Sequence, residues 1–413
     1  MRIIHTSDWH LGNRLLGHSR QDEFQQFLEW LLKQMQELQA DALLVSGDIF
    51  DTANPPEAAR QQYCDFLARA DETGCRHIII TAGNHDSPPQ LEATRPLLAR
   101  YHCSLVTRLT HEDAQKCLIP VASRDGREQA LVCAVPHLHV RDVALPAALE
   151  DEEARRTAYT RGIARLYGQV GELAAEWKTG HPGCPVIGMG HLTVSGIEKT
   201  ASTLDIVGTL SSVSADIFPA AFDYTALGHI HRPSETDSSH RYCGSPLAMD
   251  MDEGAYRHNI LLLETRGTEC RATEIPVPAF TQMAQCRCNS QEELHACVQG
   301  LLEQHALHHH PVWLELTYAG ADISIELVRS YLAEHLPADQ GHQTFAAKDR
   351  SACEGLARNS AGGGADETLQ NYTPETLFER KLTEFIAEHP EIDDAKQQAV
   401  RELFRSLLPE TNA

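Results

Sequence analysis

The chain of 413 residues is long enough for one large domain and one or two smaller ones, and its 42% hydrophobic content supports a packed core. Its formal net charge of -23 argues mildly against DNA or RNA as a substrate, because nucleic-acid binders usually have a basic balance. Bound divalent ions and a basic partner subunit could offset that charge where a phosphate binds. The twelve cysteines form no CxxC pair, and the sequence contains neither a secretory h-region after Met1 nor an apolar run of membrane-spanning length. We therefore expect a reducing cytoplasm and free thiols.

The first hundred residues alternate short apolar runs with stretches of helical periodicity. Buried strands are predicted at residues 2–7, 42–46 and 77–81. Between them, apolar side chains recur at helical spacing over residues 24–38, and Pro55-Pro56 opens a second helix that continues to Leu67. This order predicts right-handed crossovers and largely parallel strands, with the functional site beyond the carboxyl ends of the strands.

The remaining chain is divided into a continuation of this domain, a smaller module and a tail. Further strands are predicted at 104–106, 130–135, 185–190, 224–228, 241–246 and 259–263, with a long helix over 152–177. We expect one domain over 1–275, a small α+β module over 276–345, a linker over 346–372 and a helical tail over 373–413, which packs either on its own domain or on a partner.

Five of the apolar runs stop at residue types that bind metals. Each of these residues alone has a plainer explanation, such as a helix cap for an aspartate or a surface position for a histidine. Their joint occurrence at strand ends predicts one metal site instead. Carboxylate, amide and imidazole ligands without a thiolate suit divalent Mn, Fe or Zn. The predicted ligands are Asp8, His10, Asp48, Asn84, His191, His229 and His231.

The same residues predict a hydrolytic chemistry. Asp48 follows a central strand and is the natural bridge between two ions, which can hold a phosphate and activate a water. His85, next to Asn84, is predicted to give a proton to the leaving oxygen, with Asp86 fixing its orientation. His137 also follows a strand, but it matches no second ligand and is not assigned.

The pattern DxH…GDxxD…GNHD…GH…GHxH resembles the calcineurin-like metallophosphoesterase family. The resemblance implies an α/β fold, a β-sandwich flanked by helices, with the small α+β capping domain and the helical C-terminal tail added to it. It implies two manganese sites that share Asp48, and catalysis by His85. Asp51 occupies a position where some relatives have a second helper histidine, so no role is assigned to it. The implied ligand sets are Asp8, His10, Asp48 and His231 for one ion, and Asp48, Asn84, His191 and His229 for the other.

The sequence segments around these motifs resemble those of the DNA-nuclease subunits of that family. The segments are HTSDWHLG, VSGDIFDTANPP, TAGNHDS, ALGHIHRP and RYCGSPL, and PVWLELTY fits their capping module. The resemblance implies 3′–5′ exonuclease activity on double-stranded DNA, endonuclease activity on single strands and hairpins, Mn²⁺ (with Mg²⁺ as a substitute), a homodimer, and a place at the nucleoid. It also implies that this activity depends on ATP and that the helical tail at 373–413 binds a partner subunit. Because the chain has no Gly-Lys dipeptide and so no Walker A motif, an SbcC-type coiled-coil ATPase is the expected partner.

Two alternatives stay open. A small-molecule metallophosphodiesterase, acting for example on a cyclic nucleotide, fits the acidic charge balance better but leaves the capping module and tail without a purpose. A non-enzymatic scaffold with the same fold is the second alternative, although such a chain should have lost at least one ligand.

Overall fold

The computed structural model describes residues 1–143, 152–197, 212–319 and 323–348, together with Leu382 and Gln398. By its internal contacts the chain divides into one unit over Met1–Asp349 and another over Arg350–Ala413. The predicted tail at 373–413 and most of the predicted linker at 346–372 lie outside the described residues, and the domain limits stay predictions.

Two six-stranded sheets form the larger part of the first unit. Each has four parallel strands, β1, β4, β5 and β6 in one and β8, β9, β10 and β12 in the other. Antiparallel strands are added on one side of the first sheet (β13 and β14) and at both edges of the second (β7 and β11). The first sheet has the order β14-β13-β1-β4-β5-β6, with bounds β1 Arg2–Thr6, β4 Ala42–Ser46, β5 His77–Thr81, β6 Cys103–Val106, β13 Asn259–Arg266 and β14 Glu269–Pro276. The second has the order β11-β12-β10-β9-β8-β7, with bounds β7 Leu118–Ala122, β8 Gln129–Ala134, β9 Val186–His191, β10 Tyr224–Gly228, β11 Ser234–Glu235 and β12 His240–Tyr242.

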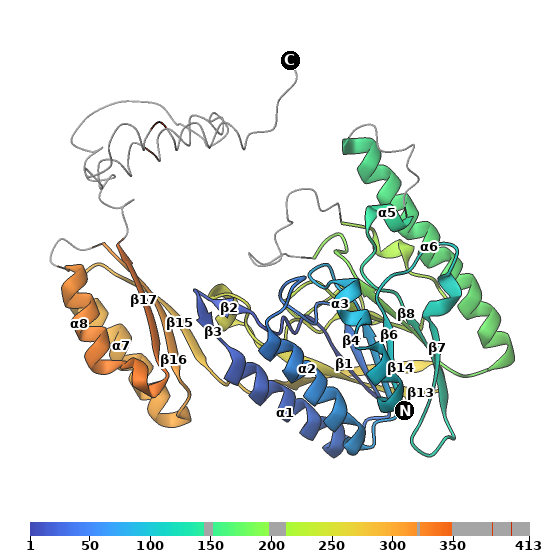
Figure 1. Cartoon of the computed structure of the whole chain (residues 1–413), viewed down its shortest axis with the longest axis horizontal. Helices are drawn as coiled ribbons and strands as arrows, with labels where there is room; N and C mark the ends of the chain where they lie inside the picture. The colour runs from blue at the N-terminus through green and yellow to red at the C-terminus, as the bar shows by residue number, and fades with distance from the viewer. Residues whose placement is uncertain (144–151, 198–211, 320–322, 349–381, 383–397, 399–413) are drawn as a thin grey trace. The chain divides into compact units, whose positions relative to one another are not determined.

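Three apolar cores hold the sheets and helices together. One lies between the two sheets and contains residues such as Leu44, Ile79 and Met189. The second packs helices α1 (Gln21–Glu37) and α2 (Glu57–Ala70) on the first sheet, and the third packs α6 (Glu152–Gly180) on the second sheet. The layers are therefore helix, sheet, sheet, helix (Figure 1), which confirms the predicted sandwich flanked by helices.

The capping module has its own small sheet and core. Strands β15 (Gln282–Cys288), β16 (Val312–Tyr318) and β17 (Gln343–Lys348) are parallel, and helices α7 (Gln291–His308) and α8 (Ile325–His335) share a core with them. Ser290 and Ser324 cap these helices by accepting hydrogen bonds from backbone N–H groups. A disulfide joins Cys286 to Cys297, so the expectation of free thiols is wrong for this pair.

Short elements complete the described part of the chain. A hairpin of β2 and β3 sets His18 edge-on against Trp313 and Phe345 of the capping module. No helix in the described ranges, α6 included, combines the length and the apolarity that crossing a membrane requires. The remaining bounds are β2 Arg14–Leu15, β3 His18–Ser19, α3 Pro88–Glu92, α4 Arg95–Leu98 and α5 Val140–Val143.

The packing of α1 on the first sheet can be tested with one substitution. Leu31 is fully buried in that core, so Leu31→Ala should lower the free energy of unfolding by about 2–5 kcal/mol, as measured by urea denaturation. Leu16→Ala is the control, because Leu16 is 47% exposed and its change should stay within about 0.5 kcal/mol. Equal effects of the two substitutions would contradict the assigned core.

Candidate metal centre

The predicted ligand residues follow five strands that come from both sheets. Asp8 and His10 follow β1, and Asp48 follows β4 in the same sheet. His229 follows β10 of the other sheet, and its backbone N–H donates to Asp8 Oδ1 over 2.9 Å. The carboxyl ends of the parallel strands in the two sheets therefore meet at one edge of the sandwich. The structure brings together all seven predicted ligands, which also include Asn84 after β5, His191 at the end of β9 and His231.

One half of this centre is built around Asn84. His191 Nε2 and His229 Nδ1 each lie 2.9 Å from Asn84 Oδ1. Asp48 Oδ2 lies 3.2 Å from His191 Nε2. Four potential ligand atoms from four chain segments thus face a common point.

The other half contains Asp8, His10 and His231, whose ligand atoms lie within 4.8 Å of one another. The Nε2 atoms of His10 and His231 are only 3.1 Å apart, as expected for two ligands that point at one ion. Asp48 Oδ2 is 3.6 Å from His10 Nε2. Since the same oxygen also approaches His191, Asp48 lies where a carboxylate shared by both halves would lie. This donor set fits a pair of divalent metal ions.

Backbone strain is concentrated in these ligands. The backbone φ values of 53°, 48°, 49° and 96° at Asp8, His10, Asp48 and His229, respectively, lie in a region that residues other than glycine seldom adopt. Each such conformation costs on the order of 1–3 kcal/mol and persists where the surrounding structure enforces it. Gly83 makes room for the conformation of Asp48, because a Cβ at position 83 would lie 2.1 Å from Asp48 Oδ1.

Asp48 and His191 shift each other's pKa. Burial alone would raise the pKa of Asp48, but His191 and His10 hold it well below its usual value. Burial alone would lower the pKa of His191, but Asp48 raises it to about 9. Burial, reinforced by His191, holds the pKa of His229 well below its usual value. The metal-free centre therefore contains a carboxylate paired with a protonated imidazole.

His85 lies beside the centre with a defined orientation. Its backbone N–H donates to Asp48 Oδ1 over 2.9 Å, and its ring Nδ1–H donates to the Asp51 carbonyl over 2.7 Å. The opposite ring atom, Nε2, therefore points away from the Asp51 carbonyl. The expectation that Asp86 orients His85 is wrong, because the Asp86 carboxylate instead accepts from the backbone N–H groups of Ile49, Phe50 and Gly83.

Besides Asp51, two residues near the predicted ligands were not assigned from the sequence. His137 Nδ1 lies 3.2 Å from the His191 carbonyl, and burial together with His191 lowers the pKa of His137 to about 4. Its position after β8, at the same edge as the ligands, is the signal that could have placed it there. Glu253 Oε1 lies 3.0 Å from His231 Nδ1, and no sequence pattern pointed to it.

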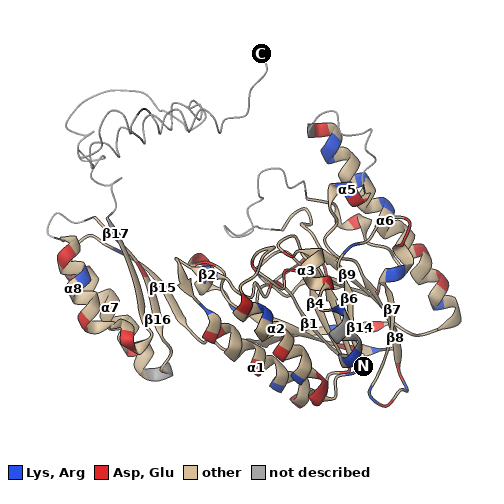
Figure 2. Ribbon diagram, viewed as in Figure 1, with Lys and Arg blue, Asp and Glu red and all other residues tan. Residues whose placement is uncertain are grey.

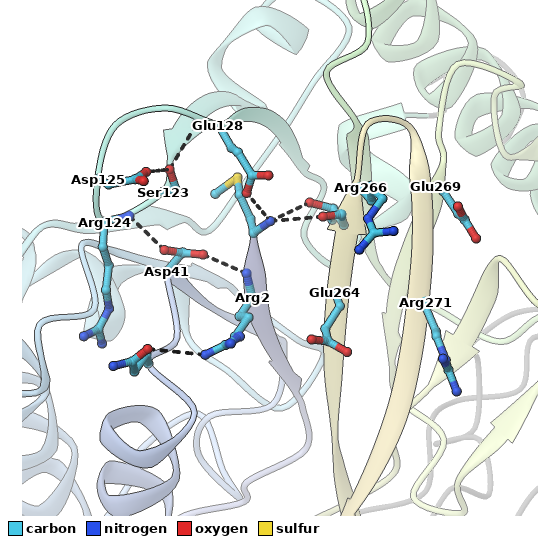
Figure 3. A pocket seen from close by; sticks show the side chains of 13 residues that line it. Arg2, Asp41, Ser123, Arg124, Asp125, Glu128, Glu264, Arg266, Glu269 and Arg271 are labelled. Atoms are coloured by element: carbon cyan, nitrogen blue, oxygen red, sulfur yellow. Dashed lines mark hydrogen bonds and ion pairs between the residues drawn. The ribbon is translucent and has the colours of Figure 1, made fainter.

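A cavity of about 610 Å³ opens at the other end of β1, away from the ligands (Figure 3). Several of its lining charges bind one another or the backbone. Asp41, for example, accepts from the backbone N–H groups of Arg2 and Arg124 over 2.7 and 2.8 Å. The chemistry of this protein is therefore assigned to the ligand cluster and not to this cavity.

Comparisons with known proteins agree with this geometry. Residues 1–233, which include all seven predicted ligands, match the model of the calcineurin-like phosphoesterase family. The SbcD component of the SbcCD nuclease of Escherichia coli (strain K12) is 33% identical over 99% of this chain and 98% of that protein. The SbcD component of Rhodobacter capsulatus is 36% identical over 67% of this chain and 69% of that protein. The SbcD component of Bacillus subtilis is 30% identical over 81% of this chain and 83% of that protein.

Metal binding should depend on pH through His191. In the metal-free protein the His191 ring keeps its proton up to a pKa of about 9, and a bound metal must displace that proton. The affinity for Mn²⁺ should therefore rise about tenfold per pH unit from pH 6.5 to pH 8. Calorimetric titration of Mn²⁺ at pH 7.5, in two buffers of different ionisation enthalpy, should detect the released proton. Heats that do not depend on the buffer would contradict this coupling.

Proposed function

This chain belongs to the calcineurin-like phosphoesterase family and to its SbcD branch, and from that premise we propose that it is the nuclease subunit of an ATP-dependent complex that processes DNA double-strand breaks and hairpins. The reaction is metal-dependent hydrolysis of DNA phosphodiester bonds. The observation that carries the proposal is the cluster of seven ligand side chains with His85 held beside it.

The ligand side chains divide between two divalent ions, which we propose are Mn²⁺, with Mg²⁺ as the alternative. When bound, such ions supply Lewis acidity to the phosphate and an activated water. Asp48 is shared, because its Oδ2 faces both His10 and His191. The proposed sets are Asp8, His10, Asp48 and His231 for one ion, and Asp48, Asn84, His191 and His229 for the other.

His85 is the proposed general acid. Because its Nδ1–H is held by the Asp51 carbonyl, the ring cannot turn freely, and Nε2 faces away from that carbonyl. A histidine in this position can give a proton to the leaving 3′ oxygen and so neutralise the negative charge that develops on it. The backbone of His85 is held by Asp48, so the proton donor and the shared ligand move together.

The proposed activities are 3′–5′ exonuclease cleavage of double strands and endonuclease cleavage of single strands and hairpins. The proposed partners are DNA, a second copy of this chain, and an SbcC-type coiled-coil ATPase that binds residues 373–413. The proposed location is the cytoplasm, at the nucleoid. Helix α1 has four acidic residues and one basic residue, Lys33, whereas α6 has both signs of charge (Figure 2), and the net charge of the chain is -23. DNA binding therefore depends on positive charge from the ions and from the ATPase.

The acidic balance also supports a second candidate, a cyclic-nucleotide phosphodiesterase. One experiment separates the two. A labelled DNA hairpin and a cyclic nucleotide are each offered to the protein with Mn²⁺ and with a chelator. Manganese-dependent cutting of the hairpin supports the nuclease, whereas hydrolysis of the cyclic nucleotide with intact DNA would reject it and leave the metal centre standing.

His85→Gln should lower hairpin cleavage by about 100- to 10,000-fold, because the proton donor is removed while all ligands stay. Manganese content, measured on the same preparation, should not change. The matched control is His181→Gln, since His181 stacks on Trp177 before β9, at the opposite end of that strand from His191. Normal turnover by His85→Gln would remove this residue from the mechanism.

Deletion of residues 366–413 should separate catalysis from assembly. We expect the shortened chain to keep manganese-dependent cleavage of the hairpin and to lose co-purification with the SbcC-type ATPase, because the proposed dock is removed. A shortened chain that still co-purifies with the ATPase at full yield would place the dock elsewhere.

A further inference from the structure

We propose that Glu253 is a positioning residue for the ligand His231, and that it connects the metal centre to the capping module. The inference rests on the proposed metal centre and assigns a role to a residue outside the ligand set. Glu253 is fully buried, in the short 3-10 helix η7 (Asp252–Ala255). A buried carboxylate needs a specific partner, and here the partner is the imidazole of His231.

The contact between the two side chains fixes the ring of His231. Glu253 Oε1 lies 3.0 Å from Nδ1, while Nε2 on the other side of the ring faces His10 Nε2 at 3.1 Å. The Nδ1–H therefore donates to the carboxylate, and Nε2 is kept as the atom that binds metal. A carboxylate in this position also makes the imidazole a stronger ligand.

Glu253 is itself held in place from several sides. Its Oε2 accepts from the backbone N–H of Met249 over 2.7 Å, and its own N–H donates to Asp250 Oδ1 over 2.9 Å. His258 Nε2 donates to its carbonyl over 3.1 Å. The carboxylate is thus a fixed support and can transmit a shift of η7 to the ligand.

Other ligand histidines are supported differently. His191 Nδ1 donates to the Ser46 carbonyl over 2.9 Å, which is a neutral acceptor. His10 Nδ1 lies 3.5 Å from Asp51 Oδ1 but is buried without a hydrogen bond. The support of His231 by a hydrogen-bonded carboxylate therefore strengthens binding of the ion at His231, and the ion at His191 receives no such support from the Ser46 carbonyl.

The capping module touches η7 on two sides. Met251, just before η7, packs with Leu15 and with Trp313 of β16. A Cβ added at Gly254 would lie 2.7 Å from the Cβ of Met283 in β15, so the two backbones approach closely. Because Glu253 lies between these two contacts, a displacement of the module moves the support of His231.

The test is calorimetric titration of Mn²⁺ into the metal-free full chain at one pH. For Glu253→Gln, which keeps the shape but removes the charge, we expect one of the two sites to weaken about 10- to 100-fold and the other to stay within about threefold. Asp252→Asn is the matched control, because it removes a charge from the same turn where the side chain is exposed. It should leave both affinities unchanged.

The outcomes separate this inference from the proposed function. If the wild-type chain binds no Mn²⁺, the metal centre itself is wrong. If it binds two ions and Glu253→Gln binds both with wild-type affinity, the role of Glu253 is wrong and the centre stands. Loss of both sites together with a lower melting temperature of the metal-free variant would show a merely structural role and also overturn the inference.

A second variant tests the connection to the capping module and does not alter the carboxylate. Gly254→Ala places a methyl group against Met283 and must separate η7 from β15. We expect it to weaken the same site that Glu253→Gln weakens. Unchanged affinity at that site would disprove the connection.

Discussion

The carboxylate of Asp48 is the group on which the centre depends. One oxygen holds the backbone of His85, and the other lies between His191 and His10. This arrangement requires a left-handed backbone at Asp48 and a glycine at position 83, since a side chain there would collide with the carboxylate. The strained conformation persists because the two sheets pack on a shared apolar core, which holds the ends of their parallel strands at one edge.

The sequence predicted the parts of this site that follow apolar runs. Strands β4 and β5 were predicted at their observed bounds, and Asp48 and Asn84 stand just beyond them. A buried parallel strand is a continuous apolar run, so its end is visible in the sequence. Strand β14 was missed because it is an edge strand with mostly exposed side chains and no such run.

Contacts made by distant loops could not be predicted from the sequence. Glu253 reaches His231 across 22 positions, and Asp86 holds the loop after β4 and not His85. No local spacing encodes either contact, because both depend on how loops pack after the sheets have formed. The same holds for the Cys286–Cys297 disulfide, which joins a strand to a helix. The ligand residues could thus be predicted from the sequence, whereas the residues that orient them could be identified only from the folded structure.

The metal content of Asp48→Ala tests most directly whether one carboxylate joins the two metal sites. After loading with Mn²⁺ and removal of free metal, elemental analysis should find about two ions per wild-type chain and close to none per variant chain. A variant that retains one ion at full occupancy, with the wild type retaining two, would contradict the shared carboxylate and the mechanism built on it.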